Sequence, residues 1–188
     1  VGLCQMDVTA SKTANLVKAS AMVRAARAEH DASLVVLPEC FNCPYGTKYF
    51  ADYAEVVPAA GTTLAAIDAH NTPTAAAMAA IAAELRVWLV AGSVPEVVAP
   101  PSASGPEGAA AAKNTYFNTS FVVDPSGTIR GVHRKVHLFK INTATVKFDE
   151  SEVLTGGRSP TVVDMTGIVP GAPLTSEGGA ATACPTVK

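Results

Sequence analysis

Cysteine is scarce in this sequence of 188 residues, which holds four: Cys4, Cys40, Cys43 and Cys184. Cysteines so few and so scattered do not form the disulfide framework of a small secreted domain. The sequence also lacks a run of about 18 apolar residues, so it predicts no membrane span, and no secretory leader is recognisable. We therefore expect a cytoplasmic protein in a reducing compartment, with no membrane as a partner.

Neither sign of charge predominates, because 14 lysines and arginines stand against 16 aspartates and glutamates, for a net charge of −2. No basic block is present to bind phosphates, so we expect no nucleic-acid partner. A chain of this length can bury the core of one domain. Its first residue, Val1, is not methionine and already belongs to an apolar run, so we expect that residues at the N-terminus are missing.

Helical periodicity is clearest in two segments, 15–29 and 73–86. Leu16, Ala19 and Val23 recur at steps of three and four, which is typical of one face of a helix. Thr72 followed by Pro73 predicts an N-cap with proline at the first helical position.

Short apolar runs bounded by turn residues predict strands between and after these helices. Asp124-Pro-Ser-Gly127 has the chemistry of a turn that joins two strands of a hairpin. The strands predicted in this way span 1–7, 33–38, 87–94, 116–124 and 128–139. Strands that alternate with helices and then form a hairpin predict a layered α/β domain.

Two segments have no apolar periodicity. Residues 97–113 are rich in proline, serine, glycine and alanine, which predicts a flexible surface insertion. From Pro170 onward the composition is typical of a disordered tail. We therefore expect one domain over 1–166, interrupted by this insertion, and a divergent tail over 167–188.

A proline and a carboxylate join an apolar run to a polar and aromatic loop in Leu34-Val-Val-Leu-Pro-Glu39-Cys-Phe-Asn-Cys-Pro-Tyr45-Gly-Thr-Lys-Tyr-Phe. The end of a strand is a rigid place from which a sheet can present a catalytic group. A lone glutamate there is most often a solvated carboxylate. The functional alternative for Glu39 is a general base, which takes a proton from a thiol and later activates water.

Lys135 stands in the segment Gly131-Val-His-Arg-Lys135-Val-His-Leu-Phe139. A lysine in an alternating strand is usually an outward-facing charge. The functional alternative is a cation aimed at negative charge that develops on a carbonyl oxygen. Glu150, in Phe148-Asp-Glu150-Ser, is by itself one of several loop carboxylates.

These three segments resemble the nitrilase, or carbon–nitrogen hydrolase, superfamily, and most closely its ω-amidase branch. The family has a matching glutamate loop, a segment Tyr-Arg-Lys-hydrophobic-His-Leu-Phe, in which His133 here replaces the aromatic residue, and a segment Phe-x-Glu-Ser. The resemblance implies an α/β fold, the α-β-β-α sandwich of the nitrilase type, incomplete at the C-terminus. It also implies that Glu39 is the general base, that Lys135 is the catalytic cation and that Glu150 positions the substrate and the lysine. Tyr45 would border the substrate pocket, although the ordinary interpretation is a loop aromatic that packs on its own turn.

The activity that the resemblance implies is hydrolysis of the amide C–N bond of short dicarboxylate monoamides, 2-oxoglutaramate and 2-oxosuccinamate. A cysteine thiolate attacks the amide carbon, ammonia leaves, and water hydrolyses the thioester. No metal or organic cofactor is implied, the partner is a small-molecule amide, and the family's assembly predicts a homodimer. The alternative is a catalytically inactive nitrilase-like module that binds a carboxylate or an amide without a nucleophile.

The nucleophilic cysteine of the family is not found in its expected context. In the family it lies in a segment Gly-hydrophobic-Gly-hydrophobic-Cys-Tyr-Asp, and the corresponding residues 170–176 contain no cysteine. Cys184 follows a little later without Tyr-Asp behind it, so we interpret it as a tail cysteine. We expect a chain that is truncated or replaced before the catalytic cysteine, with the nucleophile supplied by sequence not present here.

Cys40 and Cys43 form a Cys-x-x-Cys pair, which is half of a metal site or a redox pair. His133 and His137 would complete a set of two cysteines and two histidines, but they lie far outside zinc-finger spacing. We therefore expect no metal site. Cys4 lies in an apolar run and is interpreted as a core residue.

Overall fold

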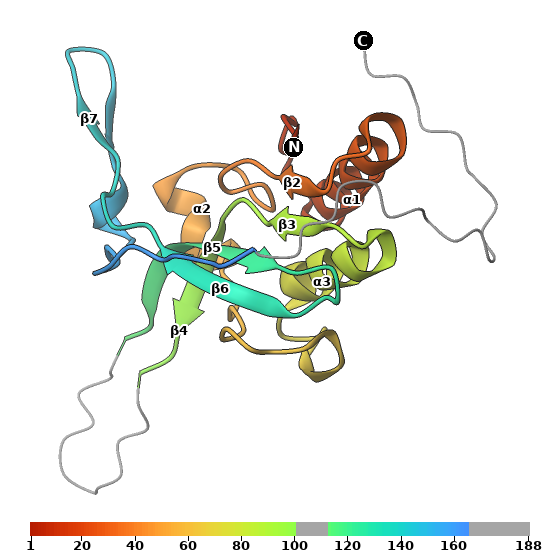
Figure 1. The fold of residues 1–188 in the computed structure, drawn as a ribbon. Helices are drawn as coiled ribbons and strands as arrows, with labels where there is room; N and C mark the ends of the chain where they lie inside the picture. The colour runs from red at the N-terminus through yellow and green to blue at the C-terminus, as the bar shows by residue number, and fades with distance from the viewer. Residues whose placement is uncertain (101–112, 166–188) are drawn as a thin grey trace, which may run out of the picture.

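The computed structural model describes residues 1–100 and 113–165, and Figure 1 shows helices packed beside one main sheet. Within these residues the main sheet has six strands: β1 (Gly2–Leu3), β2 (Leu34–Val36), β3 (Trp88–Val90), β4 (Val94–Val98), β5 (Thr115–Val123) and β6 (Ile129–Arg134). The first three strands are parallel, and β5 pairs antiparallel with β3, β4 and β6. The layered α/β domain predicted from the sequence is present.

Strand β5 organises the sheet because it pairs along both of its edges. On one edge β4 pairs with its first half and β3 with its last two residues, and on the other edge β6 pairs with its second half. The strand along this edge is therefore interrupted between β3 and β4, at residues 91–93, where Gly92 has a φ of +48°. Residues 91–93 lie beside the end of β2 and help to shape the site described below.

Two alanine-rich helices, α1 (Lys12–His30) and α3 (Pro73–Leu85), cover one face of the sheet. Val23 of α1 and Met78 of α3 are fully buried in one core with Val35, Leu89 and Phe121 of the sheet. The helices pack against each other as well, because their small side chains allow a close approach. None of the helices in the described part of the chain is long and apolar enough to cross a bilayer.

The opposite face of the sheet is open in the described residues. Leu3 of β1 is 79% exposed, whereas the adjacent Gly2 faces α1, since a Cβ there would lie 2.9 Å from Ala26 Cβ. Val36 and Val90 also face away from the helices and line an open pocket. The helices thus bury one side of the sheet and leave the side with the pocket accessible.

The start of α3 confirms the predicted positions, with Thr72 at the N-cap and Pro73 as the first helical residue, but not a capping bond from the Thr72 side chain. Thr72 precedes the helix as expected, but its hydroxyl donates to the carbonyl oxygen of Asp68 (2.6 Å) and does not cap the helix. The buried carboxylate of Glu55 accepts the bond instead, from the N–H of Thr74 (2.9 Å). Lys12 of α1 lies 2.7 Å from the same carboxylate. The cap of α3 is therefore a distant anion that sequence spacing does not reveal.

Several predicted boundaries are also wrong. The strand predicted over 87–94 ends at Val90, and the strand predicted over 128–139 ends at Arg134. The first strand has two residues, Gly2–Leu3, rather than the predicted 1–7. The insertion predicted to begin at residue 97 begins later, because Val97 and Val98 belong to β4 and pair with β5. Residues 101–112 of the insertion and the tail predicted over 167–188 lie outside the described residues.

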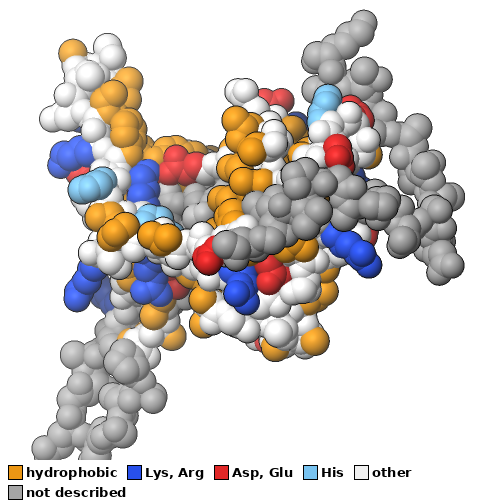
Figure 2. Space-filling view, viewed as in Figure 1, with side chains coloured by type: hydrophobic (Ala, Val, Ile, Leu, Met, Phe, Trp, Pro, Cys, Tyr) orange, Lys and Arg blue, Asp and Glu red, His pale blue; other side chains and the backbone are white. Residues whose placement is uncertain are grey.

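Three further elements were not predicted from the sequence. These elements are α2 (Thr47–Tyr53), β7 (Lys140–Asn142) and β8 (Lys147–Asp149), and the two strands form a hairpin. Two 3₁₀ turns, Leu64–Ala66 and Glu150–Glu152, are also present. The hairpin projects from the body of the molecule in Figure 1. Phe139 and Val146 beside it are 46% and 49% exposed, and Figure 2 shows apolar atoms at the surface of this region.

Candidate active site

Glu39 lies in a tight loop directly after β2. The N–H of Leu37 still donates to Val90 of the neighbouring strand (3.0 Å), which carries the strand direction up to the loop. Cys40 then adopts a φ of +48° and donates its N–H to the hydroxyl oxygen of Ser93 (3.1 Å). Gly92 is in close contact here, since a Cβ on it would lie 2.0 Å from the carbonyl oxygen of Pro38. Gly92 and Ser93, between β3 and β4, thus contact the backbone on both sides of Glu39.

Lys135 comes directly after β6, on the opposite edge of β5. Its N–H donates to the carbonyl oxygen of Asn118 (2.8 Å), and its own carbonyl oxygen accepts from the N–H of Gly157 (2.8 Å). Successive side chains of an extended segment point to opposite faces. Arg134 accordingly turns away and makes two hydrogen bonds to the buried Glu96, while Lys135 turns toward Glu39.

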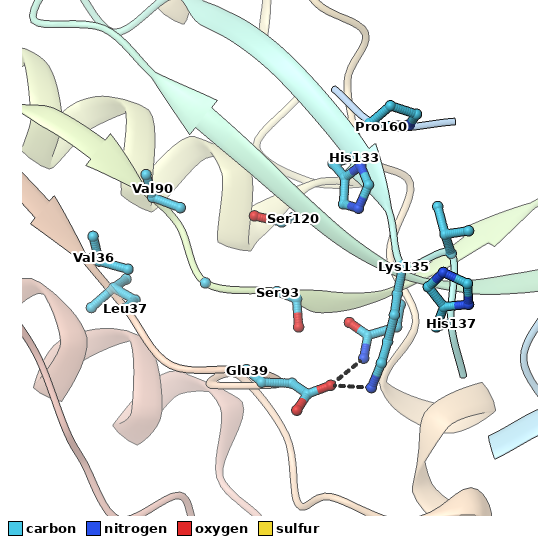
Figure 3. Close-up of a pocket in the computed structure, with 13 residues that line it drawn as sticks. Val36, Leu37, Glu39, Val90, Ser93, Ser120, His133, Lys135, His137 and Pro160 are labelled. Atoms are coloured by element: carbon cyan, nitrogen blue, oxygen red, sulfur yellow. Dashed lines mark hydrogen bonds and ion pairs between the residues drawn. The ribbon is translucent and has the colours of Figure 1, made fainter. Parts of the chain in front are cut away.

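The ammonium of Lys135 joins two carboxylates. Its Nζ lies 2.9 Å from Oε1 of Glu39, which is 96 positions earlier in the chain, and 3.0 Å from Oε2 of Glu150. Figure 3 shows the Lys135 and Glu39 side chains pointing toward each other across the pocket. Desolvation lowers the pKa of Lys135, but the bonds to Glu39 and Glu150 outweigh it and raise the pKa above its ordinary value. Lys135 is therefore a cation at neutral pH and not a proton acceptor.

Glu150 is fully buried, with 0% of its side chain exposed. Its carboxylate accepts the backbone N–H of Phe139 (2.6 Å) and the hydroxyl of Tyr45 (2.9 Å) in addition to the bonds from Lys135. Desolvation raises the pKa of Glu150, but these donors outweigh it, so the pKa lies below the ordinary value. The Glu150 carboxylate therefore remains an anion and binds the ammonium of Lys135.

Tyr45 contributes its hydroxyl to Glu150 and its ring to a small aromatic cluster. The ring packs edge-on against Phe50 (centroids 5.6 Å apart) and beside Phe148 (5.3 Å). Burial and the contact with Glu150 both raise the pKa of the Tyr45 hydroxyl, which therefore stays protonated and donates. The structure thus brings together all four residues singled out from the sequence, Glu39, Lys135, Glu150 and Tyr45.

An open pocket of about 700 Å³ lies between the ends of β2, β3 and β6, and Glu39 and Lys135 form part of its wall. Apolar side chains line one part of it and polar side chains another, and Figure 3 shows most of them. The lining residues are Val36, Leu37, Glu39, Val90, Gly92, Ser93, Asn118, Ser120, His133, Lys135, Val136, His137 and Pro160. A cavity of this size and mixed polarity suits a small organic ligand.

No cysteine is among these lining residues, all of which lie in the described part of the chain. Cys40 and Cys43 are 1% and 0% exposed and pack with Phe50 and Leu154. The contact with Cys43, followed by desolvation, raises the pKa of Cys40. Within residues 1–100 and 113–165 no three histidine, cysteine or acidic side chains are grouped to hold a metal ion. Cys184 lies outside the described residues.

Sequence reasoning missed Asn118 and Ser93. Asn118 is 3% exposed and donates to Glu39 (2.7 Å), and Ser93 holds the backbone at Cys40. Asn118 lies in the strand segment Tyr-Phe-Asn-Thr-Ser, and a polar residue on the open face of a sheet is ordinary. Only the distance to Glu39 distinguishes it.

Comparison with known proteins assigns the class. A model of the carbon-nitrogen hydrolase family matches residues 1–180, and the chain belongs to this family, within the nitrilase superfamily. It is 38% identical over 165 residues to omega-amidase NIT2-B of Xenopus laevis, and 33% identical over 165 residues to omega-amidase NIT2 of Homo sapiens. Each alignment covers 87% of this chain and 50% of the relative, so the chain spans about half the length of the curated relatives it matches.

The fold agrees with this assignment. The crystal structure of Nit3 from Saccharomyces cerevisiae, a member of branch 10 of the nitrilase superfamily, superposes with a TM-score of 0.62 at 31% identity. The superposition covers 85% of this chain and 48% of Nit3. The chain therefore has a mixed α/β fold of the nitrilase type and corresponds to about half of such a domain.

Proposed function

We propose that this chain supplies the base and the cation of an ω-amidase-like hydrolase, which cleaves the amide C–N bond of 2-oxoglutaramate, 2-oxosuccinamate and similar short dicarboxylate monoamides. The observation that carries the proposal is the 2.9 Å contact between Lys135 and Glu39 at the wall of an open pocket. The names of the curated relatives support the choice of substrate class.

The two groups have separate roles in the proposed reaction. Glu39 takes the proton of the nucleophilic thiol as the sulfur bonds to the amide carbon, and it then gives a proton to the departing ammonia. The ammonium of Lys135 stabilises the negative charge that develops on the amide oxygen. Glu39 later accepts a proton from the water that hydrolyses the thioester. Lys135 suits its role because Glu39 and Glu150 keep it protonated.

The nucleophilic thiol comes from none of the described residues that line the pocket. This observation favours a second candidate function, a nitrilase-like module that holds an amide or a carboxylate without turnover. Both functions use the same pocket, and they differ in whether ammonia is released.

The test measures ammonia release and binding together. We expect the purified protein, together with the segment that supplies the nucleophilic cysteine, to release ammonia from 2-oxoglutaramate. Glu39→Gln and Lys135→Met should each abolish release, whereas Lys147→Met, which removes an exposed lysine of β8, should not. Saturable binding without ammonia would support the second function. If the protein neither binds nor hydrolyses this amide, both functions are refuted.

A further inference from the structure

We infer that Asn118 is a positioning residue that holds one oxygen of Glu39, so that only the other oxygen, Oε2, exchanges protons with the reacting groups. The inference rests on the proposed function for the identity of those groups. Its geometry stands on the contacts of Asn118 alone, which can be tested without turnover.

Asn118 contacts each of the three charged residues of the site, two through their carboxylates and Lys135 through its backbone. Its Nδ2 donates to Oε1 of Glu39 (2.7 Å) and lies 3.5 Å from Oε1 of Glu150. Its main-chain oxygen accepts the N–H of Lys135 (2.8 Å). One residue therefore fixes the backbone that carries the cation and the side chain that carries the base.

The orientation of the Asn118 amide follows from its neighbours. Ionised carboxylates only accept hydrogen bonds, and Glu39 and Glu150 both face this amide. Turning the amide over would place its oxygen against two anions. The NH₂ group of Asn118 must therefore face them.

The two oxygens of Glu39 have different surroundings. Both Asn118 Nδ2 (2.7 Å) and Lys135 Nζ (2.9 Å) donate to Oε1, and in Figure 3 two dashed lines meet at one oxygen of Glu39. No donor among residues 1–100 and 113–165 reaches Oε2. An oxygen that accepts two hydrogen bonds, one of them from a cation, is the poorer proton acceptor of the pair. A proton therefore binds at Oε2.

Lys135 by itself cannot provide this selectivity. The Glu39 side chain is 48% exposed, and an ammonium is a compact charge on a flexible stem that can bind either carboxylate oxygen. Asn118 has a short side chain on the central strand β5, which is paired on both sides at this point: with Pro95 of β4 and with the Lys135 N–H. Two donors from different directions fix the plane of the Glu39 carboxylate.

The test is the crystal structure of the Asn118→Leu variant of the 188-residue chain. Leucine keeps the size of the side chain and removes the donor, and we expect the Glu39 carboxylate to leave its present plane, so that either of its oxygens can face Lys135. Asn118→Asp adds a third carboxylate and should displace the Glu39 carboxylate further. Asn142→Asp, the same change on the exposed strand β7, is the matched control and should leave the Glu39 carboxylate in place.

An unmoved Glu39 carboxylate in folded Asn118→Leu overturns the inference, because a residue that only packs would give that result. If both variants fail to fold, NMR of the unmutated chain provides the test. A coupling through the hydrogen bond should then join Nδ2 of Asn118 to the carboxyl carbon of Glu39, and no such coupling should be seen from Nδ2 of Asn142. If the Asn118 coupling is absent, the inference is overturned as well. If ammonia is never released but the Glu39 carboxylate is held in this way, the proposed function fails and the positioning by Asn118 stands.

Discussion

The ammonium of Lys135 lies 3.0 Å from Oε2 of Glu150, a carboxylate with no exposed surface. An anion in that position depends on its donors, because it has exchanged its hydration shell for them. Lys135 is the one full positive charge among them, since Phe139, Tyr45 and Asn118 supply neutral N–H and O–H groups. The pair therefore serves the stability of the site as well as its chemistry.

Lys135→Met should destabilise the chain by about 2 kcal/mol, less than the loss expected for a wholly buried pair, because Lys135 is partly exposed and the neutral donors to Glu150 remain. The measurement is urea unfolding followed by circular dichroism. The double variant Lys135→Met with Glu150→Gln should recover part of the loss, since it leaves no unpaired charge in a buried position. Equal stability of Lys135→Met and the parent chain would contradict the prediction.

Acid should weaken the fold through Glu150. The pKa of Glu150 is lower in the folded chain than its ordinary value of 4.5, so the folded state binds its proton less readily than the unfolded state does. The stabilisation is fully present above about pH 5 and is lost as the pH falls through the folded value. We expect the urea midpoint to fall as the pH is lowered below about 5, and to fall less steeply in Glu150→Gln.

Asp149 provides an internal reference for this experiment. Its pKa is lowered to about 2, chiefly by the hydrogen bond from Lys140, and it is present in both proteins. A steep acid transition that is identical in the parent and in Glu150→Gln would assign the effect to Asp149 or other carboxylates. The prediction for Glu150 would then be wrong.

Gly92→Ala should destabilise the chain by about 2–4 kcal/mol and displace the loop that carries Glu39. Two causes combine, since the φ of +48° disfavours a side chain and the new Cβ would meet the Pro38 carbonyl oxygen at 2.0 Å. Gly61→Ala is the matched control, because Gly61 also has a positive φ but has open space where its Cβ would be. It should cost about 1–2 kcal/mol through the backbone alone. Equal losses in the two variants would show that the contact with Pro38 is unimportant.

Cys40 and Cys43 should be protected from alkylation in the native chain. Their side chains are 1% and 0% exposed, and the raised pKa of Cys40 keeps it a thiol, whereas the thiolate is the reactive form. Iodoacetamide labelling followed by peptide mass spectrometry should show slow modification of both, and rapid modification in urea. Labelling of either residue as fast in the native chain as in urea would mean that the loop after Glu39 opens freely.

Patterns among neighbouring residues predicted a helix and a turn that the structure contains. The spacing of Ala19 and Val23 predicted a helix, and both side chains are fully buried. The turn predicted at 124–127 is present, with Gly127 at a φ of +80°. The β7–β8 hairpin was missed because residues 143–146, Thr-Ala-Thr-Val, contain no glycine or proline to mark a turn.

The site depends on tertiary contacts, which limited what the sequence could predict. The resemblance to a family indicated Glu39, Lys135 and Glu150, and their catalytic roles stay predictions. Asn118 carried no local signal because its role follows from its distance to Glu39, which is 79 positions away in the chain. The Glu55 cap of α3 was missed for the same reason, since 19 positions separate it from Thr74.

The pairing of β6 with β5 has a consequence for how the gene can change. Ser120 pairs with His133 and Thr119 with Arg134, and this register decides which basic side chain reaches Glu39. Because side chains alternate, shifting β6 by one residue exchanges its two faces. Inserting a single codon within the turn at 124–127 would then direct Arg134, a planar guanidinium, to where the ammonium of Lys135 lies, whereas deleting one would place the uncharged Val136 there. We expect a substitution at the exposed Ser126 in this turn to be tolerated and a change of the turn's length to be rejected.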